Sequence, residues 1–291
     1  MSKKLIKSGL IVSVMTLVSR VLGLVRDIFI ANLMGAGASA DVFFFANKIP
    51  NFLRRLFAEG AFAQAFVPVL GEYHAKDEEN GTNETRELIA QVSGTLGVIV
   101  SIVTLVGVIA SPVIVALFGF GWFIDWLNDG ESAEKFELAS TLLKITFPYL
   151  WFVAFTALAG AILNTLGKFA VSAFTPVLLN VCIIAATIYL SPYFDDDSFA
   201  LAWGVFLGGL TQFLFQIPFL IKAGVLVKPK WAWHSEGVKK IRKLIVPALF
   251  GVSVTQINLL LDTLIASFLV TGSIAWLYYA DRLLEFPLGL F

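Results

Sequence analysis

Cysteine, histidine and charged residues are all scarce in this sequence of 291 residues. The single cysteine, Cys182, can form no disulfide within the chain, and it lies in an apolar run that suits a small packed side chain. The two histidines, His74 and His234, fall in polar segments, and no Cys/His/Asp cluster has metal-ligand spacing. We find no Ser-His-Asp or Cys-His arrangement and no phosphate-binding glycine loop. The sequence therefore predicts neither a metalloprotein nor an enzyme.

Charge is low in amount as well as balanced in sign. Charged residues make up 14% of the chain, apolar residues make up 58%, and the mean hydropathy is +0.83. A soluble protein of this length keeps far more charge on its surface. The net charge is zero, so we expect no electrostatic attraction to nucleic acid. Composition predicts an all-α polytopic membrane protein in contact with the lipid bilayer.

Turn and charge signals divide the chain into eight apolar segments. The second and seventh segments are long enough to be tilted, or bent at Pro50, Pro68 or Pro247. We therefore expect about eight transmembrane helices. The segments are Leu10–Met34, Val42–Leu70, Leu88–Phe118, Leu138–Leu163, Val171–Leu190, Phe199–Ala223, Ile241–Val270 and Ser273–Phe291.

Lysine and arginine are distributed unevenly between the loops on the two sides of these segments. Only Lys135 falls on one side, whose loops are acidic at residues 125–137 and 195–197. Cytoplasmic loops of membrane proteins are enriched in Lys and Arg, so this asymmetry predicts a cytoplasmic N-terminus. The other side carries thirteen cations: Lys3, Lys4, Lys7, Lys76, Arg86, Lys168, Lys222, Lys228, Lys230, Lys239, Lys240, Arg242 and Lys243.

Seven cations remain within the apolar segments or at their ends: Arg20, Arg26, Lys48, Arg54, Arg55, Lys144 and Arg282. Their acidic companions are Asp27, Asp41, Glu59, Asp262, Asp281 and Glu285. An ionisable group in the middle of a bilayer costs about 2.5–3.5 kcal/mol, so such groups face a protein interior or a water-filled cavity. An excess of cations favours an anionic ligand, and the guanidinium group matches phosphate geometry. We predict a polar chamber within the membrane.

A structural role is the alternative at each of these positions. Arg54 and Arg55 could mark the cytoplasmic end of the second span, and Lys144 could extend its ammonium group to the outer interface. For the other arginines, a purely structural ion pair is the less favoured interpretation, because an unpaired buried arginine needs a counter-charge.

Two parts of the sequence resemble each other. Residues 27–37, DIFIANLMGAG, match residues 262–272, DTLIASFLVTG, in length and at both ends. With one deletion, residues 46–52 then match residues 280–286. The first two spans therefore correspond to the seventh and eighth, which predicts two six-helix lobes related by a pseudo-two-fold axis. We expect Lys48 to face Arg282 across this axis, and Asp27 to face Asp262.

This repeat divides the chain into two domains. Residues 1–225 form the first six-helix transmembrane lobe. Residues 226–291 form a basic cytoplasmic loop and the first two helices of the second lobe. Because the sequence ends within an apolar run, we expect the second lobe to be truncated.

Several short motifs are spread over the whole chain. They are SRVLG at 19–23 with RD at 26–27, GAG at 35–37, KIPN at 48–51 with RR at 54–55, FAEGAF at 57–62, and YYADR at 278–282 with EFP at 285–287. Together they resemble the MurJ/MviN family of lipid II flippases. The resemblance implies the fold of the multidrug/oligosaccharidyl-lipid/polysaccharide exporters. It also implies transport of an undecaprenyl-diphosphate-linked peptidoglycan precursor, lipid II, from the inner to the outer leaflet of the bacterial inner membrane.

The resemblance further implies roles for single residues. The substrate-binding candidates are Arg20, Arg26, Arg282, Lys48 and Arg54, of which the first three correspond to arginines that engage the diphosphate. The candidates for supporting cavity or gate roles are Asp27, Asp41, Glu59, Asp281 and Glu285. Asp262 is similar to an acidic residue of a sodium site found in some members, so sodium or the membrane potential is the expected source of coupling. No other cofactor is expected.

The mechanism that we expect is alternating access of the chamber to the two sides of the membrane. One alternative is a flippase for another polyprenyl-diphosphate-linked oligosaccharide, such as an O-antigen unit. Another is a non-transporting scaffold for cell-wall synthesis proteins, which would need no charged chamber. A drug/cation antiporter of the same fold is less favoured, because its cavity should be acidic.

Overall fold

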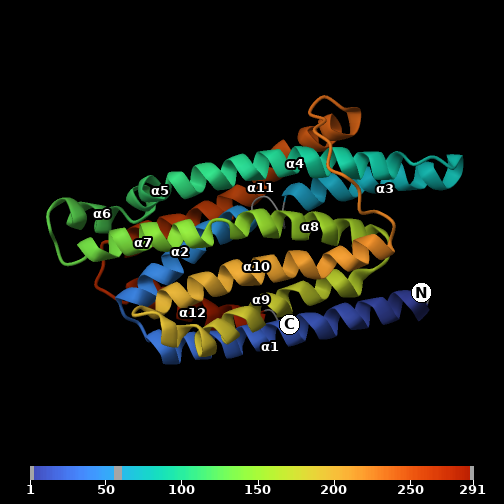
Figure 1. Ribbon diagram of the computed structural model, residues 1–291. Coiled ribbons are helices and arrows are strands. Elements are labelled where there is room, and N and C mark those ends of the chain that lie inside the picture. The colour runs from blue at the N-terminus through green and yellow to red at the C-terminus, as the bar shows by residue number, and fades with distance from the viewer. Residues whose placement is uncertain (1–2, 56–60, 289–291) are drawn as a thin grey trace.

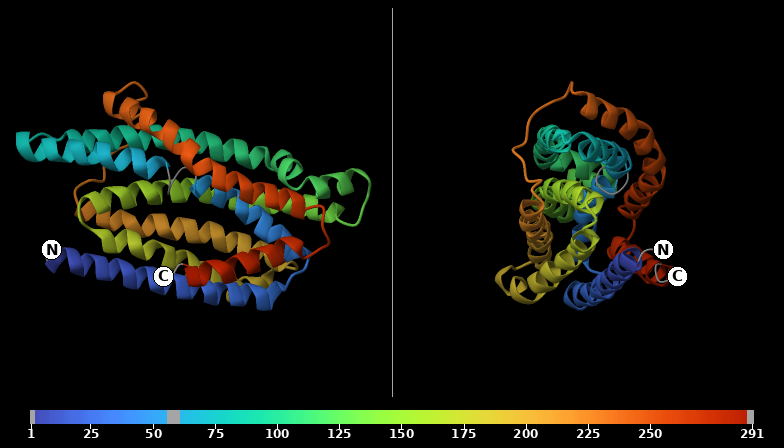
Figure 2. Two further views of the ribbon diagram at one scale, coloured as in Figure 1. Left: turned by 180° about the vertical axis from the view of Figure 1, so that it is seen from behind. Right: turned by 90° about the vertical axis from the view of Figure 1, so that its right-hand side faces the viewer.

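The protein forms helices, and no strands, throughout the residues that the computed structural model describes, 3–55 and 61–288 (Figure 1). This finding confirms the prediction of an all-α chain. Most helices run along one long axis of the molecule (Figures 1 and 2). They are α1 (Lys3–Met34), α2 (Ala38–Arg54), α3 (Phe62–Asn80), α4 (Glu84–Ile109), α5 (Ser111–Phe118), α6 (Phe120–Leu127), α7 (Ala133–Thr146), α8 (Tyr149–Thr165), α9 (Phe169–Tyr189), the 3₁₀ turn η2 (Ser191–Tyr193), α10 (Asp197–Lys222), α11 (Glu236–Ala266) and α12 (Ser273–Leu288).

Within the described ranges, five helical stretches are long and apolar enough to cross a membrane, and a bent pair adds a sixth. The pair is Glu236–Gly251 and Gln256–Ala266, which meet at 49°. The prediction of about eight spans is thus supported only in part. The predicted second span is divided between α2 and α3, and α2 has only 17 residues, with Asp41, Lys48 and Arg54 among them. The eighth predicted span corresponds to α12, which has 16 residues.

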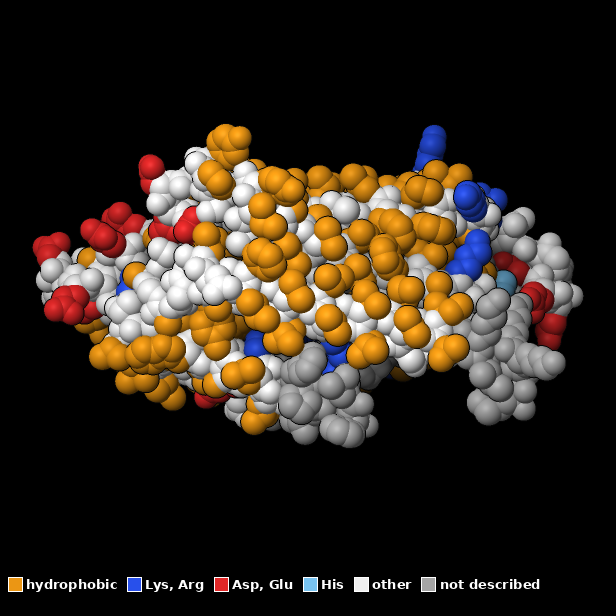
Figure 3. All heavy atoms as spheres, turned by 90° about the horizontal axis from the view of Figure 1, so that it is seen from below, with side chains coloured by type: hydrophobic (Ala, Val, Ile, Leu, Met, Phe, Trp, Pro, Cys, Tyr) orange, Lys and Arg blue, Asp and Glu red, His pale blue; other side chains and the backbone are white. Residues whose placement is uncertain are grey.

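Apolar side chains lie on the outside of the bundle as well as inside it. Large side chains such as Leu105, Ile109 and Phe250 are more than half exposed, and Figure 3 shows apolar atoms spread over the middle of one face. An apolar outer surface of this extent is expected where helices contact lipid rather than water. The outer surface therefore agrees with the predicted membrane location.

The two ends of the long axis differ in the charge that predominates. The end that holds the N-terminus also holds the α3–α4, α8–α9 and α10–α11 connections, and we call it the basic end after Lys168, Lys222, Lys228, Lys239 and Lys240. The opposite end holds the α1–α2, α6–α7 and α11–α12 connections, and we call it the acidic end after Asp125, Asp129, Glu131, Glu134 and Asp195. Acidic side chains gather at that end in Figure 3, and others lie at the basic end, where Asp77, Glu78, Glu79 and Glu84 flank the α3–α4 connection.

Helix α2 lies inside the bundle, where it contacts α7, α8, α10, α11 and α12. Its apolar face is fully buried at Phe43 and Phe45, which pack with Trp122, Leu142 and Leu150 toward the acidic end. A second buried cluster, which includes Phe66, Leu70, Leu88, Ile162 and Leu163, joins α3, α4 and α8 toward the basic end. This packing fixes α2 at the centre of the molecule, so its polar residues can line an internal space.

Candidate functional site

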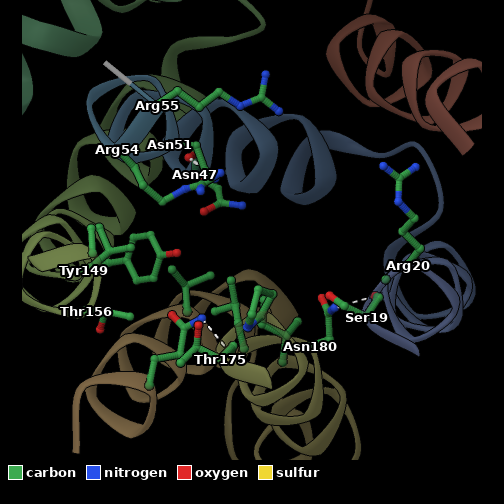
Figure 4. Close-up of a pocket in the computed structure, with 18 of the residues that line it drawn as sticks. Ser19, Arg20, Asn47, Asn51, Arg54, Arg55, Tyr149, Thr156, Thr175 and Asn180 are labelled. Carbon is green, nitrogen blue, oxygen red and sulfur yellow. Dashed lines mark hydrogen bonds between the residues drawn. The ribbon is translucent and has the colours of Figure 1, made fainter. Parts of the chain in front are cut away.

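A cavity of about 1150 Å³ lies between the helices (Figure 4). Its lining residues extend from Ile274, at the start of α12, through Phe44 and Tyr149 to Val12 and Phe169 close to the basic end. The loops of the acidic end contribute none of the described lining residues. The cavity therefore reaches toward the basic end and stops short of the acidic-end loops.

The described lining of this cavity includes six cationic and two acidic side chains: Arg20, Arg26, Lys48, Arg54, Arg55, Arg282, Asp27 and Asp281. All of them come from α1, α12 and the α2 segment, which we take to include Arg55 directly after the helix. The structure thus places every predicted substrate-binding residue in one cavity. Glu59 and the side chain of Glu285 lie outside the described residues.

Arg26 is the most buried of these cations and has several polar partners. Its side chain donates to Asp27 Oδ1 from Nε at 2.9 Å and from Nη2 at 2.6 Å, and from Nη1 to Asn180 Oδ1 at 3.0 Å. Nη2 also donates to the Tyr278 hydroxyl at 3.1 Å. Because Arg26 is only 8% exposed, these bonds replace the water that the guanidinium group loses.

The Tyr278 hydroxyl connects α12 to this pair. It donates to Asp27 Oδ1 at 3.0 Å and accepts from Arg282 Nε at 3.2 Å, and the same nitrogen lies 3.5 Å from Asp27 Oδ2. The Tyr278 ring stacks on Phe44 of α2, with 3.9 Å between centroids. One carboxylate and one hydroxyl therefore hold arginines of α1 and α12 close together, although 256 residues separate them in the sequence.

On the opposite side of the cavity from Thr175, Arg54 lies with Asn47 and Asn51 on α2 (Figure 4). Its Nε donates to Asn51 Oδ1 at 3.1 Å, and Asn51 Nδ2 donates to the Asn47 carbonyl at 2.9 Å. Arg54 and Arg55 thus line the cavity rather than only marking the end of a span. Lys144, in contrast, is exposed on α7 and is not a described lining residue of the cavity.

Asp41, for which a supporting cavity or gate role is predicted, is not among the described residues that line the cavity. It is 2% exposed and accepts hydrogen bonds from the backbone N–H groups of Gly272 at 2.7 Å and Ala275 at 2.9 Å, at the start of α12. Lys135 Nζ lies 3.6 Å from Asp41 Oδ2 and donates to Thr271 Oγ1 at 2.8 Å. Lys135, which we expected in a loop, is buried in α7. We call Asp41, Lys135, Thr271 and Gly272 the Asp41 latch.

Further contacts close the acidic end around this latch. The Tyr279 hydroxyl donates to the Gly35 carbonyl at 2.9 Å, which joins the α1–α2 turn to α12. Gly272 has φ of +100°, and a Cβ atom there would lie 2.6 Å from the Ala36 carbonyl oxygen. Only glycine allows this conformation and this approach. The cavity is therefore sealed from the acidic end by packed backbone and a buried ion pair.

We expect Lys135→Met to lower the free energy of unfolding by about 3 kcal/mol, because the Asp41 carboxylate would remain buried without its cation. Lys144→Met is the matched control, since Lys144 lies on the same helix but is exposed. Thermal unfolding of both variants in detergent micelles measures the difference. Equal unfolding midpoints would show that the ion pair does not stabilise the acidic end.

Asp27 and Asp262 do not both line the cavity, and their pairing across a pseudo-two-fold axis stays a prediction. Asp27 lines the cavity, whereas Asp262 is exposed and does not. Helix α11 lines the cavity through Gln256, Leu259 and Leu260. The described residues include no group of three or more His, Cys, Asp or Glu side chains that could hold a metal ion. Lys48 and Arg282 do line the same cavity.

Sequence reasoning missed the uncharged polar residues of the cavity. Asn180 and Tyr278 bind Arg26, and Gln212 and Gln216 are buried in the wall formed by α10. Amide side chains within apolar spans were the available signal, because such groups are rarely placed against lipid.

Comparisons with known proteins agree with this arrangement. A family model described as "Lipid II flippase MurJ" matches residues 30–291. A Vibrio cholerae protein named "Probable lipid II flippase MurJ" is 73% identical over 290 residues, which cover 100% of this chain and 55% of that protein. A Burkholderia cenocepacia protein named "Lipid II flippase MurJ" is 42% identical over 290 residues, which cover 98% of this chain and 54% of that protein.

A solved structure titled "Lipid II flippase MurJ, inward closed conformation" is similar to the whole fold. Its TM-score is 0.77 at 31% sequence identity, and the match covers 97% of this chain and 56% of the other. The chain therefore spans about half the length of the curated relatives that it matches.

Proposed function

The chain belongs to the lipid II flippase MurJ family, and we propose that its cavity binds the diphosphate of lipid II during transport across the bacterial inner membrane. The observation that carries this proposal is the excess of cations, six against two carboxylates, in the described lining of one cavity. Cations held within a membrane protein need a counter-charge. A diphosphate supplies it, with oxygens that accept paired hydrogen bonds from arginine. The role is transport in peptidoglycan synthesis rather than catalysis.

We place the basic end in the cytoplasm, with the N-terminus. The positive-inside rule supports this orientation, since the lysine-rich connections lie at that end. A cavity that reaches toward the basic end is then open to the cytoplasm, where the precursor is made, and the Asp41 latch closes the outer side.

The proposed cycle is one of alternating access. The diphosphate replaces Asp27 as the partner of Arg282, while the prenyl tail stays in the lipid. Neutralisation of the clustered arginines then lets α12 move toward α1 and α2, and the Asp41 latch opens to the outside. The membrane potential is the proposed drive for the return step, because moving one charge through 100 mV is worth about 2.3 kcal/mol. A sodium site at Asp262 would need ligands outside the described residues.

The same proposal assigns two six-helix lobes to the complete transporter. Residues 1–225 would form the first lobe, and residues 226–291 would form the basic connection and the first two helices of the second. The contact between the α1–α2 turn and the start of α12 supports this symmetry, because the two turns correspond in the sequence repeat.

The orientation predicts opposite labelling of two exposed positions. In a Cys182→Ala background, Lys228→Cys at the basic end should react with a membrane-impermeant maleimide only after the cells are opened. Glu131→Cys, at the acidic end, should react in intact spheroplasts. Reversed labelling of the two thiols would overturn the cytoplasmic placement of the basic end.

Complementation tests the substrate. The complete gene that contains this sequence should restore growth to cells depleted of their peptidoglycan-precursor flippase. Rescue of O-antigen export without rescue of growth would favour a flippase for another polyprenyl-diphosphate-linked oligosaccharide. Rescue by a variant that lacks both Arg20 and Arg26 would favour a non-transporting scaffold for other cell-wall synthesis proteins.

A further inference from the structure

The cavity has a charged side and a neutral side. The described charged lining residues all come from α1, α12 and the α2 segment. The wall built by α8, α9 and α10 is polar but uncharged. Its polar members include Thr156, Asn164, Ser172, Thr175, Gln212 and Gln216. In Figure 4, Thr156 and Thr175 lie across the cavity from Arg54 and Arg55.

Several polar groups of this neutral wall have no hydrogen-bond partner within the described protein. Gln216 is only 1% exposed, and both its Nε2 and its Oε1 lack a partner. The same holds for Thr156 Oγ1 and for Gln212 Oε1, although Gln212 Nε2 donates to the Thr175 carbonyl at 2.8 Å. Buried groups that lack a partner are rare in proteins and destabilise the fold. Three such side chains in one wall of one cavity therefore point to a ligand.

We propose that Thr156, Gln212 and Gln216, which we call the amide wall, form the subsite for the glycan of the transported lipid. This inference rests on the proposed function, which assigns the diphosphate to the cationic side. A glutamine amide offers donors as well as acceptors, and a hydroxyl offers both. These donors and acceptors match the hydroxyl and amide groups of a sugar. Because the three side chains carry no charge, they do not attract a phosphate electrostatically.

The relative depths of the two sites fit one extended ligand. Arg26 lies eight residues before the end of α1 at the acidic side, whereas Gln216 lies only six residues before the end of α10 at the basic side. Each residue adds about 1.5 Å along a helix, so the amide wall extends closer to the cavity mouth than Arg26 does. A diphosphate held by Arg26 and Arg282 would then direct its glycan along the α8–α10 wall toward the cytoplasm.

The chain offers a matched pair of substitutions that separates ligand binding from folding. Thr104 on α4 also has a hydroxyl without a partner, but it does not line the cavity. Thr156→Val and Thr104→Val make the same chemical change to the same kind of group. Gln216→Leu removes the whole unpaired amide at similar volume. If these groups have only a packing role, all three variants should bind ligand as the parent does.

The test compares two ligands on protein expressed from the complete gene and purified in detergent. Lipid II carries the glycan, and undecaprenyl diphosphate lacks it. We expect Gln216→Leu and Thr156→Val each to weaken binding of lipid II by about tenfold and to leave binding of undecaprenyl diphosphate unchanged. Thr104→Val should change neither affinity. The thermal midpoint of Gln216→Leu should equal or exceed that of the parent, because an unpaired buried amide has been removed.

Three results would overturn the amide wall as a glycan subsite. They are unchanged binding of lipid II in both cavity variants, equal weakening for the two ligands, and a loss in Thr104→Val as large as that in Thr156→Val. Failure of the parent protein to bind undecaprenyl diphosphate would instead refute the proposed diphosphate site, and the amide wall with it. Binding of undecaprenyl diphosphate together with any of the three results leaves the proposed function standing and rejects only the subsite.

Discussion

Replacing Arg282 by alanine should reduce transport of the precursor by about 100-fold or more while the protein remains folded and inserted. Arg282 is the arginine that α12 contributes to the cavity, and its side chain is 38% exposed there. A hydrogen bond to a charged group contributes about 1.5–3 kcal/mol, and a paired contact with a phosphate forms two of them. Loss of both bonds accounts for the expected size of the defect.

Arg282→Lys is the informative control for this variant. Lysine keeps the positive charge but not the planar pair of donors, so we expect an intermediate defect of about tenfold. Lys144→Ala, outside the cavity, should transport normally. Transport is measured in cells as the fraction of precursor that an externally added enzyme can modify. Normal transport by Arg282→Ala would refute a role for this side chain in binding.

Arg26→Ala should lose transport and stability together, with a decrease of about 3–5 kcal/mol in the free energy of unfolding. Arg26 donates to Asp27, Asn180 and Tyr278, and its removal would leave the nearly buried Asp27 carboxylate with a weaker set of partners. Arg20→Ala provides the contrast on the same helix. Arg20 also lines the cavity but is less buried, so we expect loss of transport with little change in stability.

A double variant separates the two effects of Arg26. Arg26→Met with Asp27→Leu replaces both charges by apolar groups, which is often neutral for stability where the loss of one partner is not. We therefore expect the double variant to recover most of the thermal midpoint lost in Arg26→Ala and to remain inactive in transport. A double variant that is no more stable than the single one would show that the ion pair is not what holds α1 in place.

The cationic side of the cavity could be predicted from the sequence because a charged side chain in an apolar helix is unfavourable in contact with lipid. Arg20, Arg26 and Arg282 had to face a protein interior or a wet space, and their excess over nearby acids favoured a shared space. The sequence repeat and the family resemblance predicted which helices line this cavity. Hydropathy alone could not supply the partners, since the Tyr278 hydroxyl that connects Arg26 to Arg282 is an ordinary member of an apolar span.

The pairing at the acidic end could not be predicted for a different reason. Asp41 and Lys135 are 94 residues apart, and each has an ordinary interpretation by itself, one as a charge near the start of a span and the other as a loop lysine. Only the packing of α2 against α7 and the start of α12 brings them together. The number of spans also depends on tertiary structure. A short helix such as α2 is enclosed by other helices and does not need the length of an isolated span.

The most direct test of the central claim is the affinity of the purified protein for undecaprenyl diphosphate compared with undecaprenol, which has the same tail and no charge. The cationic cavity predicts that the diphosphate binds at least about 100-fold more tightly, and that this preference disappears in an Arg20→Ala, Arg282→Ala double variant. Equal affinity for the two lipids, or an undiminished preference in the double variant, would contradict a diphosphate site built from these arginines.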